Sequence, residues 1–254
     1  MTNSLSGKVA LISGSGRGIG QACALNIAKL GAKIAVFDHD KIAAEESCKM
    51  IESAGGQAQK FIVDLASANS LTQSVDSVID TFGAIDILIN AASVSGAEDS
   101  LLEFDYENWR HVIAVNLEAP RLLISLVGRH MAEKGGGKIV SISSSSGSRA
   151  PGRRPSYGIS KAALNALTRA AAAELGIHNI NVNAVAPGVT RTPLQQGIRN
   201  DEQITEAVKS GPLANFFQRV SEPDDVAATV TFLCLPSSRQ ITGQVIHTSA
   251  GVIV

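Results

Sequence analysis

A tyrosine and a lysine with helical spacing are suited to proton transfer in this chain. Tyr157 and Lys161 begin a helical pattern that continues to Leu175, and residues at i and i+4 lie on the same helix face. A free phenol has a pKa of about 10, but a nearby ammonium or a positive helix end favours the phenolate. The pair is therefore a candidate acid–base unit, although ordinary helix surfaces also carry this spacing.

Serine hydroxyls form a second candidate group. The run from Ser141 to Ser146, interrupted only by Ile142, ends a short apolar stretch that we expect to be a strand. In open α/β sheets, ligands bind outside the carboxyl ends of the strands, where these hydroxyls would lie. A hydroxyl there can donate a hydrogen bond to a substrate oxygen and stabilise its developing charge.

A glycine-rich loop lies between the first predicted strand and the helix that follows. Gly14, Gly18 and Gly20 have the spacing G-x-x-x-G-x-G. Glycines at such a turn let a pyrophosphate approach the free N–H groups of the helix N-terminus. Taken alone, the pattern also fits a plain strand–helix turn.

Asp38, at the end of the second predicted strand, favours a nucleotide site over a plain turn. A carboxylate there can accept hydrogen bonds from both ribose hydroxyls of an adenosine, and it repels a 2′-phosphate. Arg17 in the glycine loop has the opposite tendency, because a cation can pair with a 2′-phosphate. Since the acid at the strand end is the closer contact, we expect NAD rather than NADP.

Short apolar runs alternate with helical patterns along the whole chain. This alternation predicts an α/β fold: a doubly wound, mostly parallel seven-stranded sheet with helices on both faces. No linker-like run breaks it, so residues 1–254 are expected to form one domain, in which the irregular segment of about 187–221 is a substrate lid. The predicted strands are 8–12, 33–37, 61–63, 85–89, 138–142, 180–185 and 244–247, and the delimited helices are 19–30, 41–54, 161–175 and 222–235.

These motifs together resemble the short-chain dehydrogenase/reductase family, in its compact branch, over nearly the whole chain. Ser13–Gly20 matches the family's TGxxxGIG motif with serine for threonine, and Asn183–Thr192 resembles the loop after its sixth strand. Two segments depart from the family pattern. Asn90–Ser93 stands where the family usually has NNAG, beside the adenine ribose, and Ser249–Gly251 replaces Asp-Gly-Gly near the C-terminus.

The resemblance implies a Rossmann-like fold and assigns roles to matching residues. Tyr157 would be the acid–base residue, Lys161 would lower its pKa and hold the nicotinamide ribose, and Ser144 would bind the substrate oxygen, with Ser143 and Ser145 as neighbouring registers. Asn116 would hold a water that links Lys161 to solvent. The expected cofactor-binding residues are Gly14, Arg17, Gly18, Ile19, Gly20, Asp38, Asp64, Leu65, Asn90, Tyr157, Lys161, Pro187, Gly188, Val189 and Thr192. The expected substrate contacts are Ser146, Leu194, Phe216 and Phe217.

The expected activity is hydride transfer between NAD(H) and a secondary alcohol or ketone. A reductase of carrier-bound 3-oxoacyl groups is an alternative within the enzyme class, because Arg149, Arg153 and Arg154 could bind an acidic carrier or an anionic substrate. The same arginines also fit a solvated or intersubunit loop. A non-catalytic NAD-sensing module and a methyltransferase-like protein are further alternatives, but neither requires the Tyr157–Lys161 pair.

Composition limits the partners and the location. Lys plus Arg total 22 against 23 for Asp plus Glu, a formal net charge of -1, so we expect neither nucleic acid nor a membrane as a partner. Cys23, Cys48 and Cys234 lack paired spacing, which favours reduced thiols and a cytoplasmic protein, and no histidine spacing indicates a metal site. The start of the chain lacks a signal-peptide pattern, and no apolar run approaches the ~20 residues of a membrane helix. The resemblance implies a homotetramer or dimer.

Overall fold

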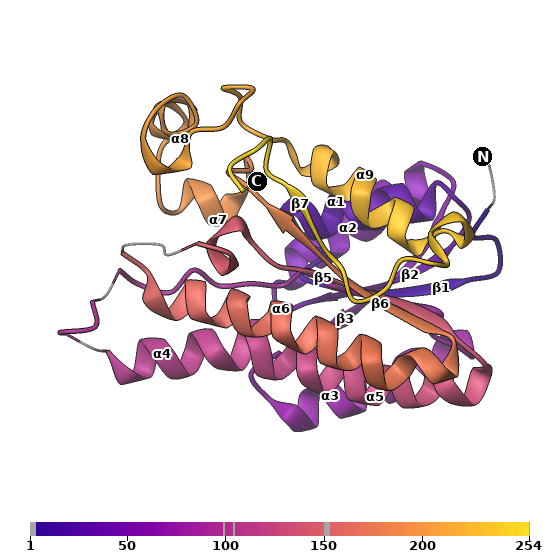
Figure 1. Cartoon of the computed structure of the whole chain (residues 1–254). Helices are drawn as coiled ribbons and strands as arrows, with labels where there is room; N and C mark the ends of the chain where they lie inside the picture. The colour runs from indigo at the N-terminus through magenta and orange to yellow at the C-terminus, as the bar shows by residue number, and fades with distance from the viewer. Residues whose placement is uncertain (1–3, 99, 104, 150–152, 254) are drawn as a thin grey trace.

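The computed structural model describes residues 4–98, 100–103, 105–149 and 153–253, and its elements alternate as the sequence predicts (Figure 1). The strands are β1 (Val9–Ser13), β2 (Lys33–Asp38), β3 (Gln57–Ile62), β4 (Ile87–Asn90), β5 (Gly137–Ile142), β6 (Ile180–Pro187) and β7 (Val245–Thr248). The α-helices are α1 (Gly18–Ala28), α2 (Lys41–Ser53), α3 (Ala68–Phe82), α4 (Tyr106–Ile113), α5 (Ala119–Lys134), α6 (Pro155–Leu175), α7 (Pro193–Gln196), α8 (Asp201–Ala207) and α9 (Pro223–Cys234). The shorter turns are η1 (Ala114–Glu118), η2 (Ser145–Gly147), η3 (Gly176–His178), η4 (Gly211–Leu213) and η5 (Pro236–Ser238).

The seven strands form one sheet in the order β3-β2-β1-β4-β5-β6-β7, and every neighbouring pair is parallel. The expected fold class is therefore confirmed, and the sheet is wholly rather than mostly parallel. The chain reverses its direction of winding between β1 and β4. In such sheets a crevice opens at this point, outside the carboxyl ends of the strands.

Helices cover both faces of the sheet, and this arrangement explains why the central strands are apolar throughout. Successive side chains of a strand point to opposite faces. Val9 and Leu11 of β1 belong to the core under α3, α5 and α6, whereas Ala10 and Ile12 belong to the core under α1, α2 and α9. Each fully buried Leu or Ile contributes about 1.5–3 kcal/mol.

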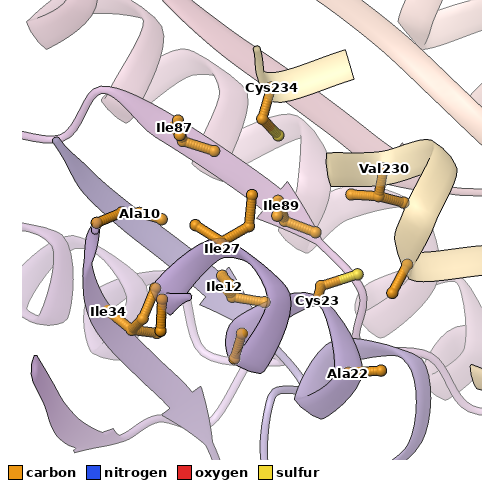
Figure 2. Close-up of a cluster of buried hydrophobic side chains, with 14 of the residues drawn as sticks. Ala10, Ile12, Ala22, Cys23, Ile27, Ile34, Ile87, Ile89, Val230 and Cys234 are labelled. Atoms are coloured by element: carbon orange, nitrogen blue, oxygen red, sulfur yellow. The ribbon is translucent and has the colours of Figure 1, made fainter. Parts of the chain in front are cut away.

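Two of the cysteines are packing residues. Figure 2 shows Cys23 of α1 and Cys234 of α9 among the aliphatic side chains of the α1/α9 core. All three cysteines are free and buried, as the sequence predicts. Burial raises the pKa of the Cys48 thiol to about 11, and it raises the pKa of Cys23 and Cys234 as well. Neutral thiols of this kind are poor nucleophiles and poor metal ligands.

The longest helical stretch, Tyr106–Lys134, runs through α4, η1 and α5. By length and composition alone it could cross a membrane, but half of its most apolar window is buried inside the protein. It contacts α3 on one side and α6 on the other and contributes Leu123 and Val127 to the core. These contacts are those of a core helix in a globular fold.

The third strand differs most from its predicted range. The sequence favours 61–63, whereas β3 spans Gln57–Ile62. It lies at the edge of the sheet, where its residues alternate between exposed and partly buried positions. An edge strand of this kind carries polar residues such as Gln57, Gln59 and Lys60, and its only apolar run is short.

The segment 187–221 is partly ordered rather than an irregular loop. It contains α7, α8 and η4, and Val189, Ile204 and Val208 form a small core of their own, with Leu213 and Val220 against it. Its two ends meet where the Arg191 N–H donates to the Ser221 carbonyl (2.8 Å). The segment is thus a small subassembly fixed to the carboxyl end of β6.

Candidate active site

A cleft of about 940 Å³ lies at the carboxyl ends of the strands. Its lining residues come from the glycine loop, from the ends of β2, β4 and β5, from the start of α6 and from the segment 187–221. Ligand sites of globular proteins have volumes of about 300–1,000 Å³, so the cleft is at the upper end of that range. It brings the predicted acid–base residues and the predicted cofactor residues into one space.

The glycine loop is held in a conformation that requires glycine. Gly14 has φ +68°, and a Cβ there would lie 2.5 Å from Cα of Ala92, while a Cβ on Gly20 would lie 2.1 Å from the Gly14 carbonyl oxygen. The loop leads directly into α1, whose N-cap residue Arg17 makes no capping hydrogen bond with its side chain. The first N–H groups of α1 therefore need another acceptor, and a phosphate group meets that need.

The carboxylate of Asp38 is fixed at the end of β2. Its Oδ2 accepts from Gly16 N (2.9 Å) and its Oδ1 from Asp40 N (3.0 Å). Arg17 does not approach this carboxylate but forms an ion pair with Asp40. Asp38, which disfavours a 2′-phosphate, and Arg17, which could pair with one, therefore do not contact each other. The charge of Arg17 is paired with Asp40 instead.

The other predicted cofactor residues line the cleft, but Asn90 does not. Asn90 is buried, and its Nδ2 donates to Ser141 Oγ (3.3 Å) beneath the cleft floor. The residues that do line the cleft are Gly14, Arg17, Gly18, Ile19, Gly20, Asp38, Asp64, Leu65, Tyr157, Lys161, Pro187, Gly188, Val189 and Thr192.

The side chains of Ser144 and Ser93 both lie close to the Tyr157 phenol. Burial raises the pKa of the Tyr157 phenol, while hydrogen bonds with the side chains of Ser144 and Ser93 lower it. Ser143 turns the other way, and its hydroxyl donates to Asn165 Oδ1 (2.6 Å) in α6. Of the three adjacent serines, Ser144 is therefore the one that contacts the phenol.

Lys161 lies beside Tyr157 in the cleft. Its Nζ is 5.7 Å from the Tyr157 ring centroid and donates to the Ile142 carbonyl (2.9 Å). Burial lowers the pKa of Lys161 to about 7. The direction of the Tyr157 pKa is set by burial of the phenol itself, which outweighs the hydrogen bonds with Ser144 and Ser93.

Asn116 is buried in η1, a single turn of π-helix between α4 and α5, and does not line the cleft. Its Oδ1 accepts from Val94 N (2.9 Å), and its Nδ2 donates to the Val94 carbonyl (2.9 Å) and to Ser160 Oγ (3.1 Å). Ser160 in turn donates to the Tyr157 carbonyl (2.7 Å). The side chain thus links the loop after β4 to the helix that carries the tyrosine. π-bulges are frequent at functional sites.

The predicted substrate residues separate into two groups. Ser146 and Leu194 line the cleft. Phe216 and Phe217 do not: they are 74% and 69% exposed. The Phe216 ring lies against Gly251 in the C-terminal tail, and the backbone N–H of Phe216 donates to the Ala250 carbonyl (2.9 Å). The apolar core of segment 187–221 is filled by other side chains, which leaves these two rings outside it.

The two departures from the family pattern have visible consequences. Ser93, in place of the usual glycine, adds a hydroxyl that contacts Tyr157 and donates to Asn116 Oδ1 (3.2 Å). Ala250, also in place of a glycine, has φ +50°, which is strained for a residue with a Cβ. The sequence analysis does not include Ser93 among the site residues. The one feature that could have indicated it is the serine in place of the family's usual glycine after the fourth strand.

Other cleft residues were also missed. His111 of α4, and Ile198, Arg199 and Leu213 of segment 187–221, line the cleft without belonging to any motif. Their positions depend on how irregular segments fold over the sheet, for which the sequence carries no periodic signal.

Comparison with known proteins shows the family. A family model described as Enoyl-(Acyl carrier protein) reductase matches residues 14–253. Short-chain reductase protein NovJ of Streptomyces niveus is 35% identical over 249 residues, which are 96% of this chain and 93% of NovJ. The 3-oxoacyl-[acyl-carrier-protein] reductase of Synechocystis sp. is 32% identical over 252 residues, 98% of each chain. A crystallised 7α-hydroxysteroid dehydrogenase in complex with NADH and 7-oxo glycochenodeoxycholic acid has a TM-score of 0.91 and 32% identity, with 98% of this chain and 96% of that chain covered.

These similarities, together with the parallel sheet and the cleft, define an α/β oxidoreductase. The chain belongs to the short-chain dehydrogenase/reductase family. Solved structures similar to it hold NADH or NADP, so the cofactor class is a nicotinamide dinucleotide. The uncapped N-terminus of α1 and the fixed carboxylate of Asp38 fit such a group.

Proposed function

We propose that this protein is an NAD-dependent dehydrogenase/reductase that interconverts a secondary alcohol and a ketone, with Tyr157 as its acid–base residue. The observation that carries this proposal is the hydrogen-bonded pair of Ser144 and Tyr157, with Lys161 beside it, in the cleft that also contains Asp38. A protein that only senses a dinucleotide has no need of a buried phenol and hydroxyl aimed at one another.

In the proposed reaction, Tyr157 donates its phenolic proton to the ketone oxygen during reduction and removes the hydroxyl proton during oxidation. Ser144 donates a hydrogen bond to the same oxygen and so stabilises the charge that develops there. Lys161, whose Nζ is 5.7 Å from the phenol ring centroid, supplies the positive charge that stabilises the phenolate when the lysine is protonated. Asn116 and Ser160 hold α6, and with it Tyr157, against the loop after β4.

The dinucleotide would be held by the glycine loop at its phosphates, by Asp38 at the adenosine ribose and by Pro187–Thr192 at the other end. When bound, the nicotinamide accepts or supplies the hydride, and the protein determines its orientation. Segment 187–221 would exclude water as a lid, with Leu194 and Leu213 on its inner side.

The test of this proposal is a panel of alcohols and ketones assayed with NAD(H) and NADP(H) in parallel. Turnover of at least one secondary alcohol or ketone supports it. The absence of turnover throughout the panel, in a protein that binds NADH, would favour the non-catalytic sensing module instead. A 3-oxoacyl thioester belongs in the panel, because the carrier-linked reductase is the alternative within the same chemistry.

We expect kcat/KM with NAD(H) to exceed that with NADP(H) by at least about 100-fold, because Asp38 repels a 2′-phosphate and Arg17 is paired with Asp40. A 100-fold preference corresponds to about 2.7 kcal/mol. Asp38→Asn removes the repulsion and should reduce the preference at least tenfold. Asp76→Asn, at an exposed carboxylate of α3 outside the cleft, serves as the control and should leave the cofactor preference unchanged. Equal use of both cofactors by the unmodified protein would contradict the assignment.

Ser144→Ala should lower kcat for alcohol oxidation on the order of 10²-fold, because one donor to the reacting oxygen is lost. It should also move the pH profile. The active base is the phenolate, so the rate falls as the pH drops below the pKa of Tyr157. Loss of the Ser144 hydrogen bond raises that pKa further, and the midpoint should shift to higher pH. Ser143→Ala is the matched control, because its hydroxyl contacts Asn165, and its midpoint should not move. If the midpoint of the pH profile shifted in Ser143→Ala and not in Ser144→Ala, the catalytic serine would be Ser143.

We further propose that the protein is a homo-oligomer, a tetramer or a dimer, located in the cytoplasm. The family membership supports the first point and the free cysteines support the second. Sedimentation analysis and cell fractionation test them.

A further inference from the structure

The substrate half of the cleft contains a guanidinium that no carboxylate of the described residues neutralises. Arg149 follows η2, the turn that begins directly after Ser144. Its Nη1 donates to the Pro212 carbonyl in η4, and its Nε is buried without a hydrogen-bond partner. Burial lowers the pKa of Arg149, and no acidic group acts against this effect. Arg149 is partly buried, and partial removal of a cation from water without a paired carboxylate carries a free-energy cost.

The neighbouring arginines are paired. Arg153 Nη1 lies 3.4 Å from Glu98 Oε2, and Arg154 Nη2 lies 3.6 Å from Glu98 Oε1. Arg154 Nη1 also donates to the Gly96 carbonyl (2.5 Å). Arg17, at the other end of the cleft, is paired with Asp40. Among the arginines of the described chain that line the cleft, only Arg149 and Arg199 have no carboxylate partner.

The position of Arg149 relates it to the substrate rather than to the dinucleotide. It joins η2, which follows the hydroxyl that contacts Tyr157, to η4 of segment 187–221. Leu194 and Leu213 line the same part of the cleft. Apolar side chains beside a guanidinium that has no carboxylate partner fit a ligand that has an apolar body and an anionic end. The planar fork of arginine can bind a carboxylate or a phosphate through two parallel hydrogen bonds.

We propose that Arg149 binds an anionic group of the substrate, a carboxylate or a phosphate, while the reacting carbon lies at Tyr157. This inference rests on the proposed function and adds the substrate class: oxo or hydroxy compounds that carry a negative charge beyond an apolar spacer. A free acid would supply a carboxylate, and a carrier-linked or phosphorylated substrate would supply a phosphate. Arg153, which is 83% exposed at its side chain and paired with Glu98, has no such role.

The test is direct binding, so it does not depend on turnover. Hexanoate, hexyl phosphate and the neutral hexanamide are titrated calorimetrically into the protein, with and without NADH. We expect one or both anions to bind at least tenfold more tightly than hexanamide, and the preferred anion identifies the source of the charge. Arg149→Gln should weaken binding of that anion at least tenfold. Arg149→Lys should retain part of the affinity, because it keeps the charge and loses the fork.

Arg153→Gln is the matched control, since it removes the same charge from the same rim and should change the affinity by less than about threefold. The NADH affinity of each variant reports that it is folded. The proposal is overturned if hexanamide binds as tightly as both anions, or if Arg149→Gln binds the preferred anion as tightly as the unmodified protein does. It is also overturned if Arg199→Gln, and not Arg149→Gln, loses affinity for the preferred anion. Failure of the redox proposal would have a different signature, the absence of turnover with every ketone, and would leave these affinities unchanged.

Discussion

Tyr157→Phe is expected to lower kcat for ketone reduction about 10³-fold, within the range of about 10²–10⁴ typical of a general acid, while the affinity for NADH changes little. The substitution removes one oxygen atom from a ring that remains packed at the start of α6. Lys161 and His111 are among the other titratable groups that line the cleft. Nζ of Lys161 already donates to the Ile142 carbonyl, so it is poorly placed to replace the phenol.

Steady-state kinetics with a ketone from the panel, together with NADH titration by fluorescence, measure the two quantities separately. Tyr106→Phe provides the matched control. The same oxygen is removed from a tyrosine that is 61% exposed at the start of α4, outside the cleft, and kcat should stay within about twofold. If Tyr157→Phe kept most of the activity, the acid would have to be His111 or Lys161, and the mechanism would be wrong.

The second large effect is expected from Lys161→Met, which should reduce kcat at least about 10²-fold and also weaken NADH binding. The methionine keeps the length of the side chain and fills the same buried space, so the loss reports the missing ammonium rather than a cavity. Lys138→Met is the control. Lys138 is also partly desolvated, with a lowered pKa, but its Nζ contacts Asn181 Oδ1 (2.7 Å) near the opposite end of β5. A variant of Lys161 with normal NADH affinity would contradict its assignment to the nicotinamide ribose.

The same substitution has a pH-dependent effect on stability, and its sign follows from the pKa of about 7 for Lys161. Between pH 7 and the ordinary lysine pKa of about 10.4, the unfolded chain holds a proton at this residue that the folded chain has lost. The free energy of unfolding contributed by Lys161 therefore rises with pH across this window and is lowest below pH 7. Lys161→Met lacks this penalty, so its melting temperature should exceed that of the unmodified protein more at pH 6 than at pH 9. Equal differences at both pH values would mean that Lys161 is not desolvated.

The sheet could be predicted from the sequence because its inner strands are buried on both faces. Such strands contain short apolar runs, as in Ile87–Ile89 and Ile139–Val140, and they are recognisable without knowledge of their partners. The edge strand β3 has polar residues on its open side, and its range was correspondingly misplaced. The helix α3 was not delimited, although Leu71, Val75 and Val78 have helical spacing and Ser67 caps its N-terminus. The many serines and threonines between these residues weaken the pattern.

The site was predictable where a residue type is required by local geometry or chemistry. Gly14 and Gly20 must be glycine, because a Cβ there would collide with Ala92 or with the loop itself. Ser144 and Tyr157 are side chains capable of hydrogen bonding and proton transfer, and the structure places them close together in the cleft. Properties that depend on tertiary burial were not predictable. The direction of the Tyr157 pKa depends on how far the phenol itself is removed from water, and the exposure of Phe216 depends on which residues fill the core of segment 187–221.

The closed base of segment 187–221 has a consequence for how this protein can diversify. Thr190 and Ser221 form a parallel bridge, and the Arg191 side chain contacts Asp201 (2.8 Å) and Glu222 (3.1 Å). The two ends of the segment are therefore held together by contacts of their own, and lengthening a loop between fixed ends costs little free energy, about 0.6 kcal/mol for each doubling. Sequence and length between those ends can change while the register of β6 and the phosphate-facing end of α1 stay the same. A segment joined at its base in this way can change in length and composition independently of the sheet that carries it.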